Sequence, residues 1–118
     1  MAVQNPIPLT VFENQDKGWV LNFTDFDGNP IDLTGFVVES AYMSSRGKPA
    51  LGTFTLNESL SDFSIGKVVI ELEPNWCDTA GIQVSKPQRV IEYQLTLDDT
   101  ANPPEYVYGY LTILRSTL

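Results

Sequence analysis

The fold of this chain is decided by one stretch, Trp19-Val-Leu-Asn-Phe-Thr-Asp-Phe-Asp-Gly-Asn-Pro-Ile-Asp-Leu-Thr-Gly35. Its first half alternates between two sides, with Trp19, Leu21 and Phe23 on one of them. This period of two predicts a half-buried β-strand over Trp19–Thr24. The second half is typical of a turn, because its Asp-Gly pair supplies positive φ angles and Pro30 cannot donate to a strand ladder.

Strand-like patterns continue along the rest of the chain. They cover Leu9–Phe12, Val37–Met43, Gly52–Leu56, Lys67–Leu72, Arg89–Asp98 and Tyr106–Leu114. Pro74 and Gly81 bracket a short helix that we predict over Pro74–Ala80. About seven strands, with turn signals roughly every 8–12 residues, predict an all-β fold, an antiparallel sandwich of two packed sheets.

Alternation also indicates which side chains face the core. We expect the core anchors to be Trp19, Leu21, Phe23, Ile91, Tyr93 and Leu95. The same rule turns Val69 outward, between the inward Val68 and Ile70. In the polar connection 57–66, we expect Leu60 and Phe63 to pack back against the body of the domain.

Length and composition exclude several classes of protein. A chain of 118 residues fits one domain, which we expect over residues 9–118, after an extended leader over residues 1–8. The formal net charge of −8 disfavours nucleic acid and anionic membranes as partners. The first thirty residues lack a signal-peptide pattern and the chain has no long apolar run, so we expect folding in a cytoplasm without membrane insertion.

One acidic cluster invites a metal-binding interpretation. Asp25, Asp27, Asn29 and Asp32 surround a glycine, and hard oxygen ligands at such spacing are typical of a Ca²⁺ loop. A Ca²⁺ loop of the EF-hand type needs a glutamate at its twelfth position, and that position is Phe36 here. The pattern therefore favours a hairpin turn, and we expect neither a metal nor another cofactor.

The usual arrangements for catalysis are missing from the sequence. The chain has no histidine, which removes the commonest general base. The acidic pairs Glu71/Glu73 and Asp98/Asp99 are typical of solvated strand edges or loops. Cys77 is the single cysteine, and the charge of the following aspartate opposes thiolate formation. We therefore expect a protein that is not an enzyme.

The last strand carries a row of tyrosines. If Val107, Leu111 and Ile113 face the core, then Tyr106, Tyr108 and Tyr110 share the outer face. Two readings remain open. Either these rings form a contact surface for a protein or a glycan, or another part of the same chain covers them.

The quoted stretch also resembles a known family. The alternating strand followed by Asp27-Gly-Asn-Pro-Ile-Asp-Leu-Thr-Gly35 is similar to the Ig-like β-sandwich domains of tailed-bacteriophage tail and baseplate proteins. The nearest likeness is the N-terminal domain of the upper baseplate protein family. The resemblance covers Val11–Tyr42, and a weaker one covers Lys67–Ile113.

The resemblance implies an Ig-like sandwich that works as a non-enzymatic structural part of the virion. Its implied partners are other tail or baseplate proteins and further copies of the chain, with attachment of fibre or receptor-binding proteins as one role. That domain usually heads a longer chain, whereas this sequence ends at Leu118, which favours an adaptor or accessory protein. The alternative is a carbohydrate-binding module that uses the exposed tyrosines.

Overall fold

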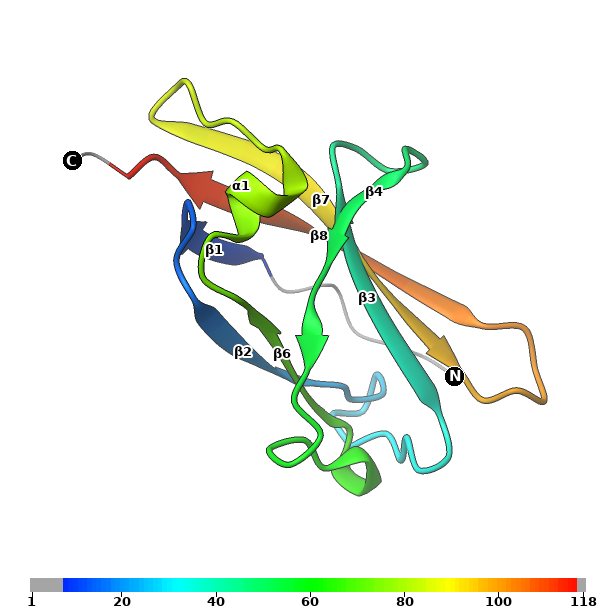
Figure 1. The fold of residues 1–118 in the computed structure, drawn as a ribbon. Helices are drawn as coiled ribbons and strands as arrows, with labels where there is room; N and C mark the ends of the chain where they lie inside the picture. Colours follow the sequence, from blue (N-terminus) through cyan, green and yellow to red (C-terminus); the bar gives the residue numbers. More distant parts are fainter. Residues whose placement is uncertain (1–7, 117–118) are drawn as a thin grey trace.

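Two β-sheets packed face to face make up the molecule, seen in a computed structural model that describes residues 8–116 (Figure 1). One sheet has five strands in the order β1 (Leu9–Phe12), β8 (Glu105–Leu114), β7 (Gln88–Asp98), β3 (Val37–Met43) and β4 (Ala50–Thr53). The other has three, in the order β2 (Lys17–Asn22), β6 (Lys67–Leu72) and β5 (Thr55–Leu56). The prediction of an all-β sandwich is confirmed. The predicted leader lies outside the described residues, apart from the exposed Pro8.

The strand order is that of an immunoglobulin-like sandwich. In such domains the second, fifth and fourth strands form one sheet, and the third and the last two strands form the other. Here β4 is an additional strand after the third, so β5 and β6 take the places of the fourth and fifth strands. With that shift, the sheet β2-β6-β5 and the sheet β8-β7-β3-β4 reproduce the arrangement. One pairing departs from the predicted antiparallel pattern: β1 runs parallel to β8, with Leu9 opposite Leu111 and Phe12 opposite Leu114.

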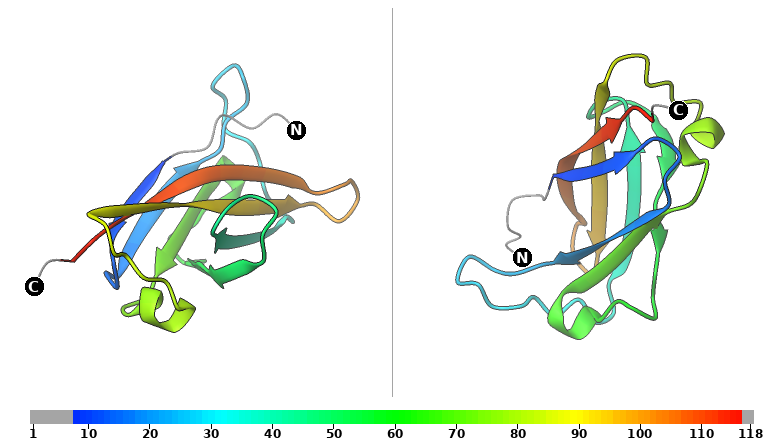
Figure 2. Two further views of the ribbon diagram at one scale, coloured as in Figure 1. Left: turned by 90° about the horizontal axis from the view of Figure 1, so that it is seen from above. Right: turned by 90° about the vertical axis from the view of Figure 1, so that its left-hand side faces the viewer.

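The longest ladder joins β7 and β8, whose alternation is also the clearest in the sequence. Their register runs from Gln88 opposite Leu114 to Leu97 opposite Glu105. Beyond this ladder the hairpin ends in a loop that protrudes from the body (Figure 2). Asp98 and Asp99 shape that loop, because their carboxylates accept the backbone N–H groups of residues 100–102 at 2.8–3.0 Å.

The core between the sheets is centred on aromatic rings that meet edge to face. Phe54 contacts Trp19, Tyr42 and Tyr93 at centroid distances of 6.0, 5.4 and 6.1 Å. Trp76 lies on the short helix α1 (Trp76–Ala80) and covers Tyr42 at 5.4 Å. Edge-to-face pairs add stability beyond the area that they bury. The helix therefore closes one end of the sandwich by capping this cluster.

Five of the six predicted anchors are buried: Leu21, Phe23, Ile91, Tyr93 and Leu95. Trp19 is instead half-buried, because it packs on the margin of the core between Phe54 and the ammonium group of Lys17, 5.8 Å from the ring centroid.

The segment predicted as one strand over Gly52–Leu56 is two strands in different sheets. β4 pairs with β3 and β5 pairs with β6, so the chain changes sheets at Phe54. Burial of the Phe54 ring explains the change, since its side chain enters the aromatic core at the crossing point. This change raises the number of strands from the predicted seven to eight among residues 8–116.

Two predictions of side-chain direction are wrong. Val69 is buried, and the connection 57–61 runs along its strand, where Ser61 accepts a hydrogen bond from the Val69 backbone N–H at 2.9 Å. Leu60 is 57% exposed, because Asn57 holds the turn around it and leaves its side chain in solvent. Phe63, which opens the 3-10 helix η1 (Phe63–Ile65), packs against the core instead.

Candidate interaction surface

The outer face of the five-stranded sheet, turned away from the three-stranded sheet, carries several large exposed side chains on β1, β7 and β8. We call the surface formed by Phe12, Val90, Tyr106, Tyr108 and Tyr110 the tyrosine face. Their exposed fractions are 49% for Phe12 and Val90, 53% for Tyr106 and 59% for Tyr110. Large side chains exposed together on one face are typical of a contact surface.

The strand register explains how these residues come together. On β8 the inward positions are Val107, Gly109, Leu111 and Ile113, so the tyrosines between them face outward. Tyr106, Tyr108 and Tyr110 lie opposite Thr96, Gln94 and Glu92 of β7. The rings of Tyr106 and Tyr108 are stacked, with centroids 6.5 Å apart and planes 26° from parallel.

Tyr108 differs from its two neighbours because a loop of the same chain covers it. Arg46, from the loop between β3 and β4, places its guanidinium group 4.0 Å from the centroid of the Tyr108 ring. The Arg46 Nε atom also lies 3.5 Å from a carboxylate oxygen of Glu92, whose side chain is 20% exposed. The ion pair and the cation–π contact together hold Tyr108 half-buried.

Arg46 is a residue of this surface that the sequence did not reveal. Its loop stands out in the sequence because it carries two of the chain's few basic residues, Arg46 and Lys48. Reaching Tyr108 requires the arginine to pass over β7, and only the sheet order β8-β7-β3-β4 brings that loop within range.

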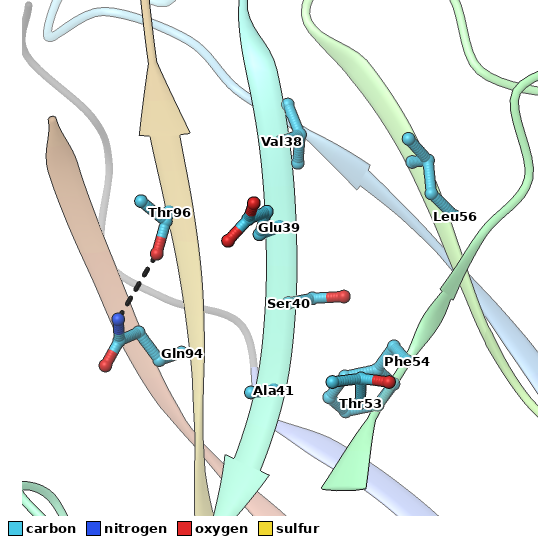
Figure 3. A pocket seen from close by; sticks show the side chains of 9 residues that line it. All are labelled: Val38, Glu39, Ser40, Ala41, Thr53, Phe54, Leu56, Gln94 and Thr96. Carbon is cyan, nitrogen blue, oxygen red and sulfur yellow. Dashed lines mark hydrogen bonds between the residues drawn. The ribbon is translucent and has the colours of Figure 1, made fainter. Parts of the chain in front are cut away.

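A groove lies beside β3, on the side of that strand away from β7. Its volume is about 380 Å³, and Figure 3 shows its lining: Val38, Glu39, Ser40, Ala41, Thr53, Phe54, Leu56, Gln94 and Thr96. The side chain of Ser40 points from β3 into the space between β3 and β5, and Leu56 borders that space from β5 (Figure 3). Gln94 donates a hydrogen bond to Thr96 at 3.2 Å on the outer rim.

The acidic turn near residue 28 uses its carboxylates to hold backbone. One oxygen of Asp25 accepts the N–H groups of Asp27 and Asn29, both at 2.9 Å. Asp32 accepts the N–H of Thr34 at 2.9 Å, and hydrogen bonds from Thr34 lower the pKa of Asp32. These contacts are those of Asx-type turns. Across residues 8–116, no three acidic or cysteine side chains are grouped so that they could hold a metal ion.

Other residues that the sequence analysis weighed for catalysis are buried or hold neighbouring parts of the chain in place. Cys77 is buried on α1, and this burial is the main cause that raises the pKa of its thiol. Glu71 accepts a hydrogen bond from the Asn57 side chain at 3.2 Å. Asn102 holds Asp99 and lowers the pKa of that carboxyl.

Comparisons with known proteins identify no family. No family model matches the sequence, and no curated protein matches it. One solved structure that matches weakly is a nucleoside hydrolase-related hypothetical protein from Saccharophagus degradans that is associated with carbohydrate metabolism. The TM-score is 0.34 at 16% identity, and the match covers 93% of this chain but 22% of that one. This likeness carries no argument about function. Among the described residues, no helix is long and apolar enough to cross a membrane.

Proposed function

We propose that this protein is a non-enzymatic structural component of a bacteriophage tail or baseplate that docks onto other virion subunits. The observation that carries the docking role is the tyrosine face, where large side chains lie half exposed on one sheet. Tyrosine is enriched at protein interfaces, because its ring is apolar and its hydroxyl tolerates water. The virion role rests on the resemblance of Val11–Tyr42 to baseplate and tail domains.

The mechanism is geometric. A sandwich with a continuous aromatic core keeps β7 and β8 rigid, so the tyrosine face is already in its binding shape before a partner arrives. Arg46 adds to this by holding Tyr108 in place. A surface that is ordered in advance loses less conformational entropy on binding. The partners we propose are other tail or baseplate proteins and further copies of this chain, with fibre or receptor-binding proteins attached through them.

A carbohydrate-binding module is the second candidate, and one observation favours it. The rings of Tyr106 and Tyr108 lie next to one another on the outer face, 26° from parallel, and neighbouring exposed rings can serve as a platform for a sugar. The guanidinium group of Arg46, 4.0 Å from the centroid of Tyr108, occupies one side of that platform. The docking role therefore fits the tyrosine face better, because it does not require the side of the Tyr108 ring that Arg46 occupies to be open.

The test is incorporation into particles. A phage that lacks this gene is complemented with the wild-type chain or with the Tyr106→Ser, Tyr110→Ser double variant, and purified particles are assayed by quantitative mass spectrometry. We expect the wild-type chain in the particles and about thirtyfold less of the double variant, which corresponds to the loss of one interface hot spot of about 2 kcal/mol.

The matched control is Val20→Ser. Val20 is 51% exposed on β2, in the other sheet, so its replacement removes a similar exposed apolar group away from the tyrosine face. We expect this variant to enter particles as the wild type does. Particles without the wild-type chain would overturn the virion role. Binding to a glycan array that the double variant abolishes would favour the carbohydrate-binding module.

A further inference from the structure

Part of β3 has an open edge. On one side β3 pairs with β7 along its whole length, from Val37 opposite Asp98 to Met43 opposite Glu92. On the other side β4 pairs only with the stretch Ala41–Met43. Residues 37–40 therefore have no hydrogen-bonded strand on that side within the part of the chain that the structure describes. In a β-strand every second residue turns its N–H and C=O groups to the same side, so this edge offers unpaired backbone groups.

The groove of Figure 3 lies against this open edge. It forms where the chain leaves β4 and crosses to β5, so a space of about 380 Å³ remains between β3 and β5. Val38, Phe54 and Leu56 supply apolar lining, and the hydroxyl of Ser40 lies between them. A strand laid along β3 would therefore find backbone partners on one side and an apolar hollow below it.

The charge beside the edge is negative. Glu39 is exposed on the outer side of β3, and none of the ion pairs or hydrogen bonds described for residues 8–116 involves it. The chain as a whole carries 15 acidic residues against 7 basic ones. An occupant with a positive charge opposite Glu39 complements this site, whereas a second copy paired edge to edge would bring two Glu39 carboxylates together.

We propose that the edge of β3 binds an extended segment of another protein by β-strand addition, and that this segment reads apolar–Lys/Arg–apolar. Backbone hydrogen bonds to residues 37–40 supply affinity, and the side-chain positions supply specificity. Since strand side chains alternate, the residues opposite Val38 and Ser40 enter the groove while the residue between them meets Glu39. This site is distinct from the tyrosine face and does not rest on the proposed function.

The test is selection from a display library of random eight-residue peptides on the purified full-length chain. Enriched peptides should carry the apolar–Lys/Arg–apolar motif, and the best of them is then measured by calorimetry and NMR. Its binding should shift the backbone amide signals of Val38, Glu39 and Ser40. Ser40→Tyr, which fills the groove from a strand-compatible position, should weaken binding at least about tenfold, the loss expected for a blocked pocket.

A charge exchange separates this site from nonspecific attraction to an acidic protein. Glu39→Lys should weaken the selected peptide about two- to fivefold and restore binding to the same peptide with Glu in place of its Lys or Arg. Asp16→Lys makes the same charge change in the turn between β1 and β2 and should leave both affinities unchanged. Failure to enrich any peptide, amide shifts confined to β8, or equal effects of the two charge variants would overturn the proposal.

Discussion

Tyrosines on the two faces of the five-stranded sheet have opposite surroundings. On the inner face Tyr42 and Tyr93 are at most 4% exposed, and both make edge-to-face contacts with Phe54. On the outer face Tyr106 and Tyr110 are more than half exposed, although Tyr110 lies only one position from Gly109, which pairs with Tyr93. The same residue type therefore serves stability on one face and remains free for contact on the other, and substitutions on the two faces should have different effects.

The largest expected effect is at the inner face. Tyr93→Ala should lower the free energy of unfolding by about 3–5 kcal/mol, because it removes a buried aromatic ring and leaves a cavity beside Phe54. Urea unfolding followed by tryptophan fluorescence measures this change. A loss below about 1 kcal/mol would mean that the ring is not part of the tightly packed core.

Gly109→Ala should have the next largest effect, a loss of about 1–3 kcal/mol in the free energy of unfolding. A Cβ atom at this position would lie 2.5 Å from ring atoms of Tyr93, so the ring must move. The same substitution in the Tyr93→Ala background should cost clearly less, because the obstacle is gone. Equal costs in both backgrounds would contradict this packing.

Arg46→Ala should lower the free energy of unfolding by at most about 1 kcal/mol. It removes a cation–π contact with Tyr108 and an ion pair with Glu92, but the Arg46 side chain is 62% exposed and solvent screens the charges. Part of the loss should disappear at high salt. Lys48→Ala in the same loop is the control and should leave stability unchanged. An equal loss in both variants would indicate a general effect of charge.

Tyr110→Ser should have the smallest effect on stability, within about 0.5 kcal/mol of the wild type, because the ring is 59% exposed. Thermal unfolding measures this. The comparison between the faces fails if this variant unfolds as readily as Tyr93→Ala. Weaker association with tail proteins at unchanged stability, measured by analytical ultracentrifugation, would assign the outer ring to docking.

Much of this arrangement could be predicted from the sequence because it depends on local patterns. The alternation in Arg89–Asp98 places Ile91, Tyr93 and Leu95 in the core, where the structure has them. Gly81 ends α1 in the left-handed conformation, with φ of 73°, as glycines commonly do at the ends of helices. The row of outer tyrosines also follows from a period of two.

The remaining features depend on contacts between distant segments, which a local pattern does not contain. Residues 52–56 alternate like one strand, and nothing in that alternation marks Phe54 as the point where the chain changes sheets. Val69 occupies an outward position by period, yet it is buried, and the distant Ser61 contacts its backbone. The groove beside β3 exists only because β4 leaves its sheet early, so the sequence offered no sign of it.

The parallel pairing of β1 with β8 has a mechanical consequence. Leu9–Phe12 lies beside Leu111–Leu114, and both strands run in the same direction. A pull on the chain before Leu9 and a pull on the chain after Leu114 therefore act in opposite directions along the two strands. Such a load shears the ladder and strains its hydrogen bonds together, whereas peeling would break them one at a time. The pair thus acts as a clamp that resists tension applied through the two ends of the sandwich.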